Sequence, residues 1–167
     1  MRRDNRGLSL VELMVVIAII AVVTSVGVMG VNAMTGRPAQ QCAQKVVYSL
    51  ERHRTTAMGK VDASYTLRWD ASQNQVMLDE YVKNEGAGTT STTPLGAGGV
   101  KLFYITSADA TEHSLEAEGS LTLSFDRSSG AFKPLASGAF CTEIIAKRGG
   151  REFSVKLVPL TGKVYID

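Results

Sequence analysis

The feature that most constrains this chain is an apolar run close to its N-terminus. From Leu13 to Gly36 the sequence holds 24 consecutive uncharged residues. In a helix that rises about 1.5 Å per residue this run reaches roughly 36 Å, and the hydrocarbon core of a bilayer is about 30 Å thick. The apolar core of a secretory signal peptide is shorter, at about 7–15 residues. We therefore expect a helix that spans the membrane.

Charged residues before this run predict its orientation. Arg2, Arg3 and Arg6 precede it, so the positive-inside rule places the N-terminus in the cytoplasm and everything after about Gly36 outside. The net charge of +2 for the whole chain equals the charge of residues 1–7, which hold three arginines and one aspartate. The rest of the chain is neutral, and a basic body that binds nucleic acid is therefore not indicated.

A carboxylate, Glu12, lies at the front of the apolar run, where such a group is costly and usually functional. The surrounding sequence, GLSLVELMVVIAII, resembles the N-terminal motif of type IV pilins and type II secretion pseudopilins. In that family a short basic leader ends in glycine, and the fifth residue of the mature chain is glutamate. Here the leader is residues 1–7, ending at Gly7. Leu8 becomes the new N-terminus, where the family most often has phenylalanine, and Glu12 is the fifth mature residue.

The resemblance implies how the chain is processed and assembled. A prepilin peptidase would cut after Gly7, and the amine of Leu8 would be methylated. The chain would lie among membrane lipids until an inner-membrane assembly platform adds it to a filament of pilin or pseudopilin subunits, packed helix against helix. A buried carboxylate is costly unless it is paired. The family's proposed partner for Glu12 is the N-terminal ammonium of a neighbouring subunit.

The helix is expected to continue past the apolar run, from about residue 9 to about residue 58. Residues 8–36 would be its transmembrane and assembly half. Residues 37–60 would be an amphipathic half, because apolar residues recur there at helical spacing. Pro38 removes one backbone donor and should kink or loosen the helix.

After Ser64, apolar and polar residues alternate, which predicts half-buried antiparallel strands. The segments KRGGRE and LTGK predict hairpin turns. We expect an α+β, pilin-like fold in which the long helix packs on an antiparallel sheet domain, exported and formed by residues 61–167. The expected strands lie near residues 65–70, 74–82, 100–106, 121–126, 140–147, 153–158 and 163–167.

Residues 84–99, NEGAGTTSTTPLGAGG, interrupt this pattern with five glycines and no aromatic residue. We expect a mobile surface loop without secondary structure. The alternative is a surface displayed on a filament, with sugars attached to its threonines.

The two cysteines are expected on the exported side, Cys42 on the helix and Cys141 in a strand. Cysteines outside the cytoplasm oxidise readily, and packing of the helix on the sheet makes a disulfide between them geometrically reasonable. In the chain-entropy model a bridge closing a loop of about 100 residues adds up to about 4.7 kcal/mol. The alternative is two separate buried thiols that act as small apolar residues.

The chain offers little that would support catalysis. His53 and His113 stand alone, without metal-ligand spacing, and are expected to be ordinary exposed residues. Asp79 and Glu80 are adjacent in a predicted strand and so point to opposite faces rather than forming an acid–base pair. We expect no enzyme activity, no cofactor and no metal. A single-pass membrane enzyme is an alternative without a candidate nucleophile.

Two further segments bear on the subclass. LSFDRSSGAFKP and the closing VPLTGKVYID loosely resemble the minor H-type pseudopilins and their minor-pilin relatives, and a major pilin is the alternative. Some minor-pilin relatives bind DNA through paired basic residues in a closing strand, where this chain has Lys163 alone. A DNA-binding minor pilin of a natural transformation pilus would use this lysine with the cluster Lys147, Arg148 and Arg151. Nucleic acid is not the expected partner.

Overall fold

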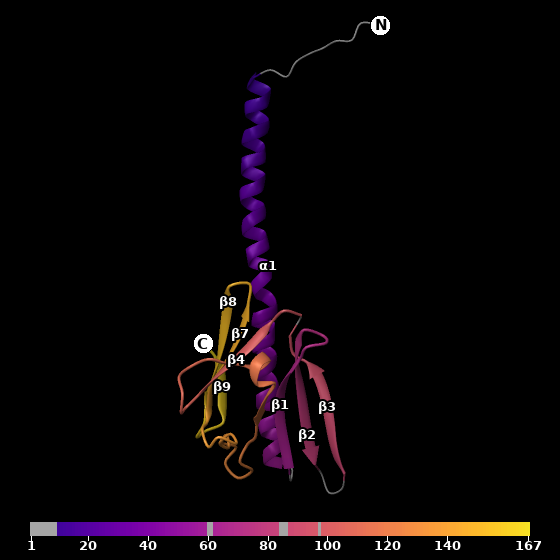
Figure 1. Ribbon diagram of the computed structural model, residues 1–167, viewed down its shortest axis with the longest axis vertical. Coiled ribbons are helices and arrows are strands. Elements are labelled where there is room, and N and C mark those ends of the chain that lie inside the picture. Colours follow the sequence, from indigo (N-terminus) through magenta and orange to yellow (C-terminus); the bar gives the residue numbers. More distant parts are fainter. Residues whose placement is uncertain (1–9, 60–61, 84–86, 97) are drawn as a thin grey trace. The chain divides into compact units, whose positions relative to one another are not determined.

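One long helix and two antiparallel sheets make up the fold (Figure 1). The computed structural model describes residues 10–59, 62–83, 87–96 and 98–167, and for residues 23–35 it describes the helical backbone alone. The helix α1 (Leu10–Gly59) runs through Pro38 without a break. The chain divides into two units, Met1–Thr35 and Gly36–Asp167, so the second half of α1 belongs to the same unit as the sheets. The predicted α+β fold is confirmed.

The first sheet has the strand order β3-β2-β1-β6. All its neighbouring strands pair antiparallel. Its strands are β1 (Asp62–Asp70), β2 (Gln75–Lys83), β3 (Gly88–Pro94) and β6 (Ser120–Leu123).

The second sheet has the order β5-β4-β7-β8-β9 and is also antiparallel throughout. A short helix, α2 (Leu115–Glu118), follows its shortest strand. The strands of this sheet are β4 (Lys101–Thr106), β5 (His113–Ser114), β7 (Cys141–Arg148), β8 (Arg151–Val158) and β9 (Lys163–Ile166).

The second half of α1 is helical and buried along one stripe, as its spacing predicted. Within the core this stripe meets strands from both sheets. The helix and the two sheets therefore share one hydrophobic core. Packing against both sheets removes the apolar side chains of the stripe from water. The residues of the stripe, each no more than 6% exposed, are Ala39, Cys42, Ala43, Val46, Leu50 and Ala57.

Alternation along the strands places their apolar side chains in this core. Tyr65 and Leu67 of β1 are fully buried. They pair across the sheet with Leu123 and Leu121 of β6, whose side chains are also buried. Val155 and Leu157 of β8, in the second sheet, are also buried in this core. The half-buried strands predicted from period two are therefore confirmed.

The expectation of a loop without secondary structure over residues 84–99 is wrong for its middle. Residues Gly88–Pro94 form β3, paired with β2 from Lys83↔Gly88 to Met77↔Pro94. Every residue of this strand is exposed. An edge strand that buries neither face carries no hydrophobic alternation, so period two could not reveal it. Its run of β-branched threonines is the one feature of this sequence that favours a strand.

Both predicted hairpin turns are present. Gly149 and Gly150, with φ of 60° and 76°, join β7 to β8 in a two-residue turn, and consecutive positive φ values are what such a turn needs. Gly162, with φ of 65°, lies in the turn before β9. Glycine adopts this left-handed region without the cost that a Cβ would bring.

Candidate functional site: the helix and the basic turn

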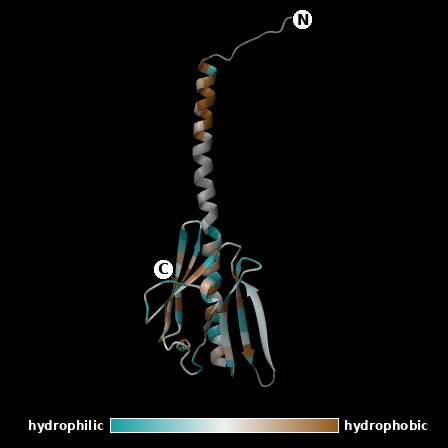
Figure 2. Cartoon of the chain, viewed as in Figure 1, coloured by the Kyte–Doolittle hydropathy of each residue, from teal (hydrophilic) through white to brown (hydrophobic). Residues whose placement is uncertain are grey.

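The first part of α1 presents an apolar surface. Between Leu10 and Val22 the large apolar side chains are exposed, with Leu10 at 74% and Met14 at 64%. Figure 2 shows this segment as the most hydrophobic stretch of the described helix. Exposed apolar surface of this extent marks a site that contacts lipid or another apolar surface.

Glu12 is the one charged residue between Leu10 and Val22, and it lies in the first turn of α1 with its side chain exposed. A carboxylate there is favoured by the positive end of the helix dipole. The predicted processing residues Gly7 and Leu8 lie outside the described residues, so cleavage and methylation stay predictions.

Farther along α1, the face opposite the buried stripe is exposed and polar. Tyr48 stands out from it with 68% of its surface exposed. On one side it borders a shallow hollow of about 400 Å³ formed with Glu51, Arg52 and Thr55.

Cys42 and Cys141 are both buried and both free thiols. Cys42 belongs to the helix stripe and packs near Gly96, where an added Cβ would lie 3.5 Å from its sulfur. The Cys141 thiol donates to the carbonyl oxygen of Glu143 at 3.6 Å. Burial raises the pKa of each thiol to about 12, because the thiolate loses its hydration. The structure thus holds the cysteines as two buried thiols in one core, and the disulfide stays a prediction for protein exported by its host.

The expectation that His53 is exposed is wrong, because its side chain is only 1% exposed. Its ring centroid lies 5.7 Å from that of Tyr65 and 6.1 Å from that of Phe125. Within the described chain its Nε2 atom has no hydrogen-bond partner. The sequence did carry a signal, since His53 lies three residues after Leu50 and four before Ala57, on the helix stripe.

His113 is half-buried rather than exposed, and its ring stacks on Tyr104 with centroids 5.2 Å apart. Its Nδ1 lies 3.4 Å from a carboxylate oxygen of Glu118. The isolated position of this histidine in the sequence gave no indication of these contacts.

Asp79 and Glu80 point to opposite faces of β2, as predicted. Asp79 accepts from Arg68 at 3.1 Å on the solvent side of the sheet. Glu80 is buried and pairs with Arg52 of α1. This ion pair ties the helix to the first sheet, and a buried carboxylate needs such a partner.

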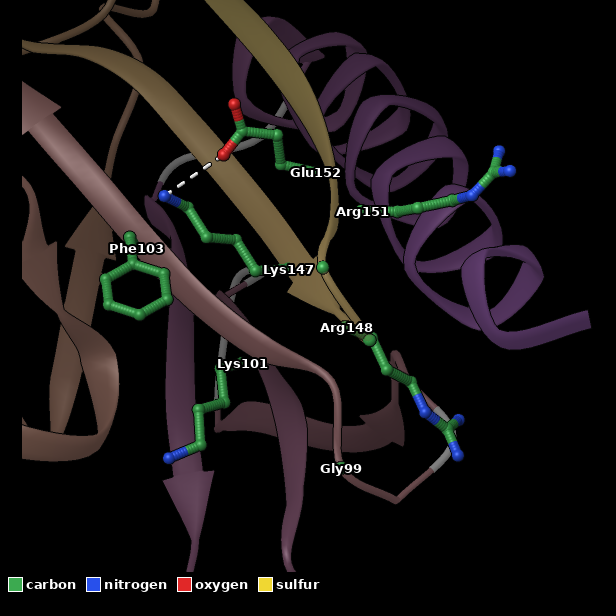
Figure 3. Close-up of a pocket in the computed structure, with 9 residues that line it drawn as sticks. Gly99, Lys101, Phe103, Lys147, Arg148, Arg151 and Glu152 are labelled. Atoms are coloured by element: carbon green, nitrogen blue, oxygen red, sulfur yellow. Dashed lines mark ion pairs between the residues drawn. The ribbon is translucent and has the colours of Figure 1, made fainter. Parts of the chain in front are cut away.

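The predicted basic cluster forms at the turn between β7 and β8, here called the basic turn and defined as residues 147–151. It borders a hollow of about 390 Å³ that is also lined by Lys101 and Phe103 (Figure 3). Lys147 lies 5.1 Å from the centre of the Phe103 ring. Its ammonium binds Glu112 at 2.8 Å and Glu152 at 3.1 Å, and these contacts raise the pKa of the lysine.

Arg148 and Arg151 extend away from this lysine in Figure 3. Their Cα atoms are partners across the turn in the β7–β8 register, and their side chains diverge. Within the described residues neither guanidinium forms an ion pair. The charge that the basic turn offers to a ligand is therefore that of the two arginines.

Lys163 does not join this cluster. It pairs with Val158 at the opposite end of β8 from Arg151. Seven strand residues at about 3.3 Å each place it roughly 23 Å away. The structure therefore brings together three of the four basic residues considered for DNA contact and separates the fourth.

Comparison with known families identifies the N-terminal segment. Residues 2–28 match the prokaryotic N-terminal methylation motif. No curated protein and no solved structure matches the chain. The chain thus carries the signal of type IV pilins and pseudopilins, the class whose precursors a prepilin peptidase processes. This signal points to a structural subunit that assembles with other pilins, and to a precursor anchored in a membrane.

Within the described residues, no helix combines the length and the apolarity that crossing a membrane requires. Among the same residues, no group of three or more histidine, cysteine or acidic side chains could hold a metal ion.

Proposed function

We propose that this chain is the precursor of a structural subunit of a type IV pilus or type II secretion-like filament. The observation that carries the proposal is the methylation motif over residues 2–28, in register with Gly7, Leu8 and Glu12. The fold supports it, because an apolar helical segment leads into an α+β domain built around the second half of the same helix.

Cleavage after Gly7 creates an ammonium at Leu8, one helical turn before Glu12. In the filament the exposed apolar side chains of residues 10–22 pack against those of other subunits. The Glu12 carboxylate then leaves water and requires a cation, which the ammonium of a neighbouring subunit supplies. Because an uncompensated charge in this setting is costly, the pairing selects one register of helix packing.

Before assembly, the precursor is held in the cytoplasmic membrane by the uncharged run from Leu13 to Gly36, with its arginine-rich leader inside and its domain outside. The length of that run and the charge of residues 1–7 support this orientation.

Within the class we favour a minor pseudopilin or minor pilin. The segment LSFDRSSGAFKP, which resembles this subclass, forms a compact turn after β6. Asp126 accepts from the backbone N–H groups of Ser128 and Ser129 at 3.1 and 2.9 Å, and the rings of Phe125 and Phe132 lie 4.5 Å apart in the core.

Intact-mass spectrometry of protein taken from its native host tests the proposal. We expect a chain that begins at Leu8 and carries one N-methyl group. A Gly7→Lys variant should stay uncut and remain out of filaments, while Gly59→Lys, at the exposed end of α1, should be processed normally. Assembled material that begins at Met1 or Arg2 would contradict the proposal.

A further inference from the structure

Three arginines lie near Gly36, the last residue of the uncharged run. Arg37 follows Gly36 directly in the sequence. The aliphatic part of Arg151 packs over Gly36 so closely that an added Cβ there would collide with it. Arg148 is the Cα partner of Arg151 across the basic turn. The turn is thus fixed beside the residue that ends the uncharged run.

Among the described residues these arginines, unlike the lysines beside them, have no acidic partner. Lys101 binds Glu116 at 2.7 Å, and Lys147 is shared by Glu112 and Glu152. Over the described residues none of the three arginines forms an ion pair. Arg37 is exposed, as is Arg151, and both can reach a ligand from solvent.

A guanidinium group binds a phosphate through two parallel hydrogen bonds, which suits it to phosphate ligands better than an ammonium. If Leu13–Gly36 spans the bilayer, as the proposed function requires, covalent continuity at Gly36 places these arginines at the level of the lipid headgroups. Attraction of basic side chains to an anionic membrane decays over about 8–10 Å, so only groups this near the surface take part.

We propose that Arg37, Arg148 and Arg151 form a binding site for the phosphate groups of anionic phospholipids. The site holds the domain of the membrane-anchored precursor against the bilayer surface before assembly. This inference rests on the proposed function, because it needs the apolar run to lie in the membrane.

The layout fits a membrane surface better than duplex DNA. The three arginines cluster at one end of the domain, whereas Lys163 lies roughly 23 Å away along β8. A duplex is held by phosphate contacts spread along its backbone, and binding without several of them is weak. A headgroup layer needs only the local cluster.

The test uses the full chain in lipid nanodiscs of phosphatidylcholine, with or without an equal part of phosphatidylglycerol. Hydrogen exchange of the backbone amides is measured at residues 147–151 and compared with residues 127–133. We expect phosphatidylglycerol to slow exchange at the basic turn by about fivefold for each engaged arginine, and higher salt to abolish the effect.

An Arg148→Gln/Arg151→Gln variant should lose this protection. The matched control is Arg127→Gln/Lys133→Gln, which removes the same charge from exposed positions beside Gly130. Gly130 contacts Arg54, 18 helical residues or about 27 Å from Gly36. Unchanged exchange elsewhere in both variants shows that they are folded.

Equal exchange in both kinds of nanodisc would overturn the headgroup site and leave the proposed function intact. Protection by added duplex DNA but not by phosphatidylglycerol would overturn it in favour of a nucleic-acid ligand. A chain that does not insert into either nanodisc would contradict the membrane anchoring itself.

Discussion

At the scale of single residues, Glu12 is the side chain on which the proposed assembly depends. Replacing it with leucine should leave membrane insertion and cleavage intact, because the apolar run and Gly7 are unchanged. Incorporation into filaments should fall by more than about 100-fold, since losing one member of a buried ion pair costs about 3–5 kcal/mol. The measurement is the ratio of variant to tagged wild-type subunit in sheared filaments.

Glu51 offers a matched control for this substitution. It is exposed on the outer face of the same helix and belongs to no ion pair of the described chain. Glu51→Leu should assemble at close to the wild-type level. Equal incorporation of Glu12→Leu would mean that the carboxylate has no part in docking.

The burial of His53 predicts that the stability of the domain depends on pH. Burial lowers the pKa of His53 below 6.5, a bond to the Ala63 backbone opposes this, and the charge of Arg52 adds to it. The unfolded chain therefore binds a proton that the folded chain resists, and the free energy of unfolding should fall as the pH drops below about 6.5. Urea unfolding at pH 7.5 and pH 5 measures this loss.

A His53→Phe variant should unfold with little difference between the two pH values, because no group at position 53 titrates. An equal loss of stability in His53→Phe would assign the pH dependence to other groups.

At the scale of elements, the turn before β9 is packed against the turn after β6. A Cβ on Gly162 would collide with the backbone carbonyl of Gly130, while Gly150 has no atom within 4 Å of the equivalent position. Both have positive φ, at 65° and 76°. Gly150→Ala should therefore lower the free energy of unfolding by only roughly 1–2 kcal/mol, which is the cost of placing alanine in the left-handed conformation.

Gly162→Ala should cost clearly more, by about 2 kcal/mol or above, because a backbone atom has to move as well. Thermal or urea unfolding of the two variants makes the comparison. Equal destabilisation would show that the two turns are not in contact.

The elements that the sequence predicted are those with one buried face. In β1, the alternation of Tyr65 and Leu67 with polar neighbours records the burial that the structure shows. β3 buries nothing and β5 has two residues, so neither leaves a periodic trace. The spacing of apolar residues also predicts the helix stripe, and His53 lies on that stripe although histidine is usually a surface residue.

The residues of the candidate site also divide into those that local sequence places together and those that only the tertiary fold places. Lys147, Arg148 and Arg151 could be grouped in advance, because one two-residue turn joins them. The separation of Lys163 follows from the pairing register of β8 with β9, a relation between distant segments that no local pattern contains. The ring contacts of His113 are likewise tertiary.

At the scale of the whole molecule, the two thiols report on the integrity of the core. With pKa values of about 12, neither is ionised at pH 8, and both side chains are shielded from solvent. Folded protein isolated under reducing conditions should resist alkylation by iodoacetamide at pH 8 and label at both sites once urea unfolds it.

A non-reducing peptide map of protein exported by its host addresses the disulfide. Separate alkylated peptides for Cys42 and Cys141 would rule the bridge out, and a linked pair would establish it. Rapid labelling of either thiol in folded, reduced protein would contradict the buried core.

The sequence of strand β3, at the edge of the first sheet, can be changed with little effect on the core. Its seven residues are held by backbone pairing to β2, and every one of its side chains is exposed. A short epitope or a fluorescent label placed among these threonines would disturb no packed side chain. Antibody or label access to that strand in intact filaments would then map which flank of each subunit faces outward.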